Sequence, residues 1–232
     1  MATQQTYLEL INRVLRRITQ AEITTVAGVT GQAKIISNLI NEAQNELYTE
    51  TNWYTLYATR TFSTVAATET YAVATDFGRN IDLIDMTNNL TLMENSSKFF
   101  DIDDPQDTDQ GNPIWFSIQG ANYRLYPIPA GIYTIRDRYW KVPAILSGDT
   151  DTSILPLDAE NCIIQWSLYK MLEYLNKFEA ADRSRIEFER MLVRAKASNL
   201  KILDNMNIMQ APVPFNGIAP PRFPSTYGAR YY

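Results

Sequence analysis

Residues 147–172, SGDTDTSILPLDAENCIIQWSLYKML, contain the change of pattern that decides the fold. As far as Leu155 the stretch is rich in Ser, Thr, Asp and Gly, which is typical of a loop. Pro156 and Asp158 then mark the start of a helix, with a proline just ahead of it and an acid in its first turn. The apolar side chains that follow cover more than half of a helical circumference. Such a helix is expected in the middle of a helical bundle.

Three other segments carry amphipathic helical periodicity. Two precede the quoted stretch and form an N-terminal helical pair, and Thr6 with Glu9 fits a capping box at the start of the first. The third follows the central helix and forms a hairpin with it that breaks near 177–181. The three expected apolar stripes are, in order, Leu8, Ile11, Leu15 and Ile18; Ile36, Leu39, Ile40, Ala43 and Leu47; and Ile186, Met191, Leu192, Ala195, Leu200 and Leu203.

The middle of the chain, from Trp53 onward, alternates in polarity and is rich in Thr, Tyr and Phe, which favours β-strands. WYTLYATRTFSTV, LTLMENSSKFF and the stretch from Trp115 to Pro143 belong to this region. Gly120–Asn122 and Pro127–Gly131 are expected turns between short strands. We therefore predict an α+β fold, in which N- and C-terminal helices form a bundle and a central antiparallel β insertion of five or more strands projects from it.

This pattern divides the chain into four parts. Residues 1–52 are the N-terminal helical pair, 53–155 the β-rich insertion, 156–205 the C-terminal helical hairpin, and 206–232 an extended arm rich in proline and aromatic residues.

The composition excludes several classes of enzyme. Among 232 residues there is no histidine, so Ser–His–Asp triads, Cys–His dyads and histidine-dependent metal centres are impossible. The single cysteine, Cys162, lies in an apolar helical run and is expected to be a buried thiol. The sequence has no P-loop, no dinucleotide-binding glycine motif and no C-x-x-C. We predict no cofactor and no metal.

Charge and hydropathy suggest where the chain works. The formal net charge is −5, which disfavours a protein that grips nucleic acid through a basic face. The first residues lack the layout of a secretion signal, and no apolar stretch approaches the about 20 residues of a membrane span. We expect a soluble, non-secreted protein with no membrane partner.

Two acidic patterns invite chemical interpretations. A calcium loop starting at Asp101 would place Pro105, Gln106 and Asn112 where an oxygen ligand, a glycine and a glutamate are needed. The five aspartates between 101 and 109 therefore indicate a solvated surface loop, whose charges are available to an arginine patch on a neighbour.

Paired carboxylates are the second pattern, because two acids in a cleft can hydrolyse glycosidic bonds. Glu42 with Glu46, or Glu187 with Glu189, are available, but the first pair lies one turn apart on a face predicted to be exposed. A hydrolase that uses such a carboxylate pair stays an alternative, with no aromatic sugar platform to support it.

The chain ends in APVPFNGIAPPRFPSTYGARYY, residues 211–232, which holds five prolines, five aromatic residues, two arginines and no acid. Proline disfavours a helix and favours an extended conformation. An extended aromatic segment with restricted freedom is suited to docking in a groove of another chain. Folding back on its own subunit stays open. The expected partner-binding residues are Phe215, Pro220, Pro221, Arg222, Phe223, Tyr227, Arg230, Tyr231 and Tyr232, with the arginines pairing with carboxylates.

The order of these elements resembles the head-to-tail adaptor (connector) proteins of tailed bacteriophages. The resemblance runs from the first helix to about residue 203. The residues that carry it are the strand end at Tyr71–Phe77, the strand–turn–strand around Tyr123–Pro129, the strand that spans Tyr139 and Pro143, the Leu146–Ser147 break, and Leu155–Pro156 before the long apolar helix.

The resemblance implies a structural virion protein with no enzymatic activity. Adaptors of this family form dodecameric rings beneath the portal and connect the DNA exit of the capsid to a tail or nozzle protein. The genome then passes through the axial channel without specific binding, and C-terminal arms are associated with the portal. It also implies a place at the head–tail junction of the virion, with assembly in the host cytoplasm. The alternatives are a virion-associated cell-wall hydrolase that uses a carboxylate pair, or another tail-completion protein.

Overall fold

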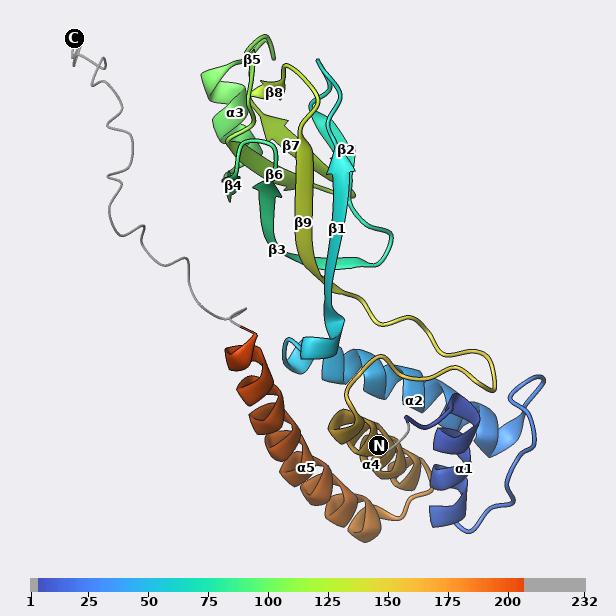
Figure 1. Cartoon of the computed structure of the whole chain (residues 1–232). Helices are drawn as coiled ribbons and strands as arrows, with labels where there is room; N and C mark the ends of the chain where they lie inside the picture. Colours follow the sequence, from blue (N-terminus) through green and yellow to red (C-terminus); the bar gives the residue numbers. More distant parts are fainter. Residues whose placement is uncertain (1–3, 207–232) are drawn as a thin grey trace, which may run out of the picture.

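The protein has an α+β fold in which helices from both ends of the chain flank a central β insertion, as predicted (Figure 1). The structure is a computed structural model, and it describes residues 4–206. Four helices form the bundle: α1 (Tyr7–Arg17), α2 (Gly31–Glu50), α4 (Leu157–Tyr174) and α5 (Phe178–Asn205). The expected arm, 206–232, lies outside the described residues except for Met206.

Helix α4 is the central helix of the bundle. It packs against α5 on one side and against α1 and α2 on the other (Figure 1). Ile163 and Met171 are completely buried, and Cys162 between the same neighbours is buried too. Burial on several sides explains why this segment is apolar around most of its circumference. The hairpin between α4 and α5 turns between Tyr174 and Phe178, close to the predicted break.

Helix α1 buries a slightly different stripe from the predicted one. Tyr7, Leu10 and Val14 are buried together with Ile11, whereas Leu8 is only half-buried. One of the two bonds of the predicted capping box is present, because the Thr6 hydroxyl oxygen accepts the Glu9 backbone N–H at 3.3 Å. This bond satisfies one of the amide donors that a helix start leaves without a partner.

The predicted apolar stripe of α5 is wrong at two of its positions. Ile186 and Leu200 are exposed, and the buried residues of α5 are mostly small or polar, with one leucine: Ala181, Ser184, Ala195, Asn199 and Leu203. Asn199 is buried because its amide is paired on both sides. It accepts the Tyr54 N–H at 2.9 Å and donates to the Asn52 carbonyl at 2.8 Å. A satisfied amide fills a place where the periodicity predicts an apolar side chain.

The β insertion is a curled seven-stranded sheet in the order β1-β9-β3-β4-β6-β7-β2, with a separate pair β5-β8 (Figure 1). A short 3-10 helix, Tyr54–Leu56, leads into it. The strands are β1 (Tyr57–Ser63), β2 (Thr70–Ala72), β3 (Phe77–Asp85), β4 (Leu90–Glu94), β5 (Gln110–Gly111), β6 (Trp115–Gln119), β7 (Asn122–Tyr126), β8 (Ile128–Pro129) and β9 (Thr134–Lys141).

Most neighbouring strands are antiparallel, but β4–β6 and β5–β8 are parallel pairs. A parallel pair needs a crossover connection, and helix α3 (Ser97–Asp103) lies in the connection between β4 and β6. The pattern of the sequence placed LTLMENSSKFF in the β-rich region and did not predict this helix. The Ser96 hydroxyl oxygen caps α3 by accepting the Lys98 N–H, and Phe100 is buried against Tyr126 with ring centroids 5.1 Å apart.

The expected turns are present. Gly120 has φ +58° in the two-residue connection between β6 and β7, where Gln119 pairs with Asn122. Glycine adopts this left-handed conformation without a steric penalty. The stretch Pro127–Gly131 also reverses the chain, and it contains the short strand β8.

The described part of the protein has two hydrophobic cores, one in the helical bundle and one in the β insertion. The larger one fills the helical bundle and includes Trp53, Leu56 and Trp140 from the base of the β insertion. The smaller one lies inside the curled sheet and is made of Leu83, Leu92, Phe116, Tyr123, Leu125 and Ile135. Strands β1 and β9 run from the first core to the second, so they carry the insertion away from the bundle (Figure 1).

Candidate interaction surfaces

The groups with potential chemical reactivity lie in unreactive places. Cys162 is buried in α4, and burial raises the pKa of its thiol to about 12, so the thiolate is scarce at neutral pH. Glu42 and Glu46 are exposed on the outer face of α2. Glu189 is exposed on α5 and lies 3.9 Å from the Arg185 guanidinium, while Glu187 is half-buried.

The cavities found in the described part of the chain do not contain these carboxylates. One, of about 100 Å³, lies between the start of α4 and the end of α5 and is lined by Tyr54, Asp158 and Asn199 among others. The second, of about 390 Å³, is an open hollow in the loop Glu22–Ala33. Within residues 4–206, no group of three or more metal-ligating side chains is placed to hold an ion.

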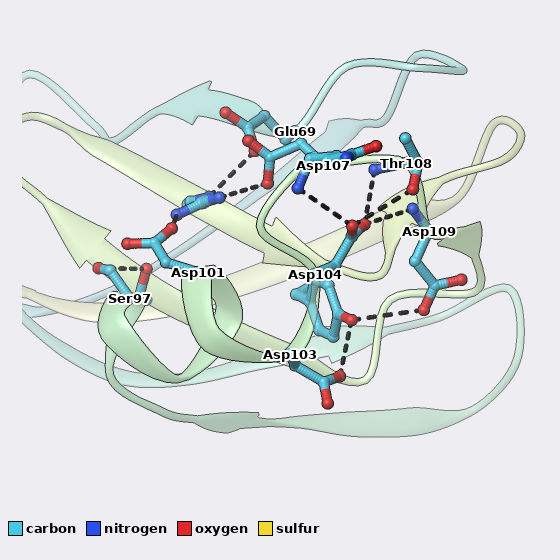
Figure 2. A network of polar contacts seen from close by, with 12 residues as sticks. Glu69, Ser97, Asp101, Asp103, Asp104, Asp107, Thr108 and Asp109 are labelled. Carbon is cyan, nitrogen blue, oxygen red and sulfur yellow. Dashed lines mark hydrogen bonds and ion pairs between the residues drawn. The ribbon is translucent and has the colours of Figure 1, made fainter.

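The acidic loop between α3 and β5 is organised by one arginine of its own chain (Figure 2). Arg124, on β7, is only 7% exposed. Its guanidinium donates to Glu69 at 3.0 Å, to Asp101 at 2.5 Å and to Asp107 at 2.6 Å. Burial alone would lower the pKa of Arg124, but these carboxylates outweigh it and raise the pKa. Part of the expected surface charge is therefore neutralised within the subunit.

Asp104 organises the same loop through hydrogen bonds from the backbone. Its carboxylate accepts the backbone N–H groups of Asp109 at 2.5 Å, Thr108 at 2.6 Å and Gln106 at 3.3 Å (Figure 2). These bonds, that from Asp109 first, lower the pKa of Asp104. Asp103 lies nearby and accepts a hydrogen bond from the Tyr126 hydroxyl at 2.8 Å. The cluster is thus a loop stabilised by local hydrogen bonds.

A second charged group lies inside the sheet. Asp137 on β9 is fully buried and accepts hydrogen bonds from Arg60 Nε at 2.9 Å and from the Tyr123 hydroxyl at 3.0 Å. Burial raises the pKa of Asp137, and the two donors partly offset that effect. Both donors belong to the β insertion, so this buried group links β9 to β1 and β7 inside the sheet.

Exposed apolar side chains remain as the candidates for function. One group lies at the distal end of the insertion, where Met93 and Ile102 are exposed and Phe99 contacts Trp115 with ring centroids 5.7 Å apart. Another is the row Ile186, Val193 and Leu200 on α5. The sequence contained a signal for this row, since its members are seven residues apart, but periodicity alone did not show that the row faces outward. The nine expected partner-binding residues, 215–232, lie outside the described residues.

The sequence matches the family described as SU10 adaptor protein over residues 5–212. This match spans both helical parts and the whole β insertion. The chain belongs to the SU10 adaptor family. Membership confirms the resemblance to the head-to-tail adaptors of tailed phages, which the order of helices and strands had indicated. No curated protein matches the sequence.

As a member of the SU10 adaptor family, the protein is a structural adaptor of a bacteriophage, and its place is the virion. An adaptor is a protein that connects other proteins. This role agrees with the surface of the chain, where the features still without an explanation are exposed apolar and charged faces. None of the helices within residues 4–206 is long and apolar enough to cross a membrane.

Proposed function

We propose that this chain is a head-to-tail adaptor that forms a ring, dodecameric as in its relatives, between the portal and a tail or nozzle protein. The observation that carries the proposal is the SU10 adaptor match over residues 5–212. The fold supports it, because a rigid helical bundle and a projecting β insertion give one subunit two separate ends with which to contact two neighbours (Figure 1).

The ring would surround the DNA exit channel and let the genome pass without specific binding. The chain has a formal charge of −5. A protein that holds DNA neutralises phosphates with many Lys and Arg side chains, and it releases counterions as it does so. An acidic wall repels phosphate and so favours passage over retention.

The C-terminal segment is proposed to attach the ring to the portal. Residues 211–232 contain two arginines and no acid, together with the anchors Phe215, Phe223, Tyr227, Tyr231 and Tyr232. Aromatic and arginine side chains are the residues that most often dominate binding energy at interfaces. Pro220 and Pro221 reduce the entropy that the segment loses on docking, and Arg222 and Arg230 would pair with portal carboxylates.

The same proposal assigns separate tasks to the parts of the chain. Residues 1–52 and 156–205 would form the rigid body of each subunit, residues 53–155 the module that reaches the neighbouring component, and 206–232 the arm. No observation on the described residues favours the hydrolase alternative, because Glu42, Glu46 and Glu189 are exposed and none of the four carboxylates lines either cavity described above.

Electron microscopy of the chain mixed with its portal tests this function directly. We expect rings seated on the portal, with a rotational symmetry that can be counted in class averages. Deleting residues 211–232 should abolish attachment while it leaves the melting temperature of the isolated chain unchanged. Replacing Ser225 and Thr226 by alanine in the same segment serves as the control. A chain that never joins the portal contradicts the proposal, and a large loss of melting temperature on deletion contradicts the docking role of the arm.

A further inference from the structure

The outer side of α5 carries a row of four basic side chains. Arg183, Arg190, Arg194 and Lys201 are all exposed, and none of them forms an ion pair within residues 4–206. Steps of seven, four and seven residues return to the same side of an α-helix, so the four side chains lie in one line, which we call the basic row. The basic row is about 27 Å long, because each residue from Arg183 to Lys201 advances the helix by about 1.5 Å.

The basic row faces away from the bundle. Helix α5 packs against α4 through its opposite side, where Ala181, Ala195 and Asn199 are buried (Figure 1). The row is therefore presented to solvent along most of the length of the helix.

The acids of α5 do not neutralise the basic row. Arg185, on another flank of the helix, pairs with Asp182 and Glu189. Glu187 and Asp204 lie within one turn of members of the row, but neither forms an ion pair within the described residues. The positive charge of the row is thus left without a carboxylate partner in the described part of the chain.

A row of this kind destabilises a helix that stands alone. Arg190 and Arg194 are four residues apart, and like charges at this spacing repel each other across one helical turn. A negatively charged ligand would remove the repulsion. To serve the whole row, the ligand must carry several charges in a line, because a small anion would reach only one or two of the four side chains.

We propose that the basic row binds the phosphate backbone of the nucleic acid that passes through the ring. Each strand of a DNA duplex presents a phosphate about every 3.4 Å along the axis, so every side chain of the row can meet one without an exact register. Arginine and lysine are common ligands of phosphate oxygens, and such contacts carry no sequence information. This inference rests on the proposed function and adds to it that α5 lines the channel.

A protein partner explains the basic row less well. A protein would need several carboxylates matched in position to one straight line of cations, whereas a polyanion offers equivalent charges along its whole length. The exposed apolar side chains Ile186, Val193 and Leu200 lie about 80° further round α5, at about 100° per residue. They form a separate surface and take no part in this contact.

The acidic balance of the chain is compatible with the contact. The formal charge of −5 belongs to the whole chain, and the basic row is a local exception to it. Proteins that bind DNA only through phosphates slide along it. The row would therefore keep the genome alongside α5 while the genome moves, without recognition of any sequence.

Salt-dependent binding of a DNA duplex to the full chain tests the inference. The anisotropy of a fluorescent 30-base-pair duplex of mixed sequence is followed at 25 and 100 mM NaCl. We expect this fourfold rise in salt to weaken binding about 150-fold, because four phosphate contacts each contribute about −0.9 to the slope against log salt. Arg183→Gln, Arg190→Gln and Arg194→Gln together leave one contact, so the same rise should weaken binding of this triple variant only about 3.5-fold.

Three further variants separate the basic row from bulk charge and from folding. Lys34→Gln, Lys98→Gln and Lys177→Gln together remove the same charge at exposed positions outside the row, and this control should keep the full salt dependence. Replacing the three arginines by lysine keeps the cations and should keep it as well. Arg190→Gln alone should already reduce the salt effect to about 40-fold. Melting temperatures show that each variant is folded.

Three results would overturn the inference. They are duplex binding by the natural chain that does not depend on salt, a triple glutamine variant with the salt dependence of the natural chain, and an equal loss in the triple lysine control. A triple glutamine variant that binds the duplex normally but no longer joins the portal would assign the row to an acidic protein surface instead.

The test also separates this contact from the proposed function. Rings that join the portal despite a failed binding test leave the proposed function standing and remove only the contact assigned to α5. The expected salt dependence from a chain that never joins the portal leaves the contact standing and contradicts the proposed function.

Discussion

Arg124 holds the acidic loop of the β insertion against strand β7. Its guanidinium is buried and joined to Glu69, Asp101 and Asp107, which are themselves 33%, 59% and 45% exposed at their side chains. Removing the Arg124 guanidinium leaves three carboxylates close together. Because these carboxylates are partly exposed, water solvates them and offsets part of the lost stability. We expect Arg124→Met to lower the free energy of unfolding by about 2 kcal/mol, less than for a fully buried pair.

Urea denaturation followed by fluorescence measures this effect. Lys98→Met is the control, since Lys98 is an exposed lysine on the neighbouring helix α3 and its loss should change stability by less than about 0.5 kcal/mol. Equal effects for the two variants would show that the three carboxylates do not need Arg124.

Glu160, in the first turn of α4, provides a prediction about pH. It is completely buried, and its contact is a weak one from the Gln5 N–H at 3.4 Å. Burial raises the pKa of Glu160 above its ordinary value of 4.5. The folded state therefore keeps the proton longer than the unfolded chain, and its stability falls as pH rises from 4.5 through the raised pKa.

Glu160→Gln cannot lose a proton and should escape this fall. We expect its stability relative to the natural chain to grow between pH 4 and pH 8, by about 1.4 kcal/mol for each unit by which the pKa is raised. Urea denaturation at several pH values measures the difference. Glu46→Gln, on the exposed face of α2, is the control, and a pH profile of Glu160→Gln parallel to that of the natural chain would contradict the prediction.

At the scale of elements, strand β3 passes very close to helix α2. A Cβ atom on Gly78 would lie 2.3 Å from the Tyr48 hydroxyl oxygen and 2.9 Å from the Trp140 carbonyl oxygen. Gly78→Ala should therefore displace the Tyr48 side chain, crowd the β9 backbone, and cost about 1 to 3 kcal/mol. The melting temperature measures this cost. Gly131→Ala is the control, because its Cβ would meet no atom within 4 Å.

Relief by a second substitution would confirm the cause. Truncating Tyr48 in the Gly78→Ala background removes the nearer obstacle, so the double variant should lose less than the sum of the two single changes. Additive losses would place the strain of Gly78→Ala elsewhere.

Local signals in the sequence predicted most of the elements but not how they face one another. The central position of α4 followed from its apolar circumference, and the β6–β7 turn followed from Gly120. The helix α3 was missed because Phe99 and Phe100 favour strands locally, while the Ser96 cap and the stacking of Phe100 on Tyr126 decide for a helix. The outward row of α5 was missed because periodicity gives only the spacing of apolar side chains. Which face of α5 is buried depends also on the partners of Asn199, which are distant in the sequence. The role of Arg124 in the acidic loop could not be predicted either, because the pairing of strands in the sheet is what brings Arg124 close to that loop.

At the scale of the whole molecule, the two hydrophobic cores predict two regions of separate local stability. Phe116 belongs to the core of the sheet and Ile163 to the core of the bundle. Phe116→Ala should accelerate amide hydrogen exchange in β6 and β7 much more than in α4, and Ile163→Ala should do the reverse. Each truncation costs about 3 to 5 kcal/mol for Phe and 2 to 5 kcal/mol for Ile in a buried core.

Hydrogen exchange followed by mass spectrometry resolves the two regions. Val65→Ala, at a position 59% exposed on the insertion, is the control and should leave both rates unchanged. Equal acceleration in both regions by either core variant would show that bundle and sheet unfold as one cooperative unit.

The chain enters the β insertion along β1 and leaves it along β9, and these two strands are direct neighbours, with Tyr57 opposite Trp140 and Ser63 opposite Thr134. Both ends of about eighty residues are thus held side by side, at a separation that a tight turn can span. A lineage could exchange the distal module for one of another shape, or shorten it to a hairpin, while the helices below kept their packing. The same pair of strands would let a protein engineer graft a foreign domain at this position. Evolution of compatibility with a new host or tail would need no change in the rest of the subunit.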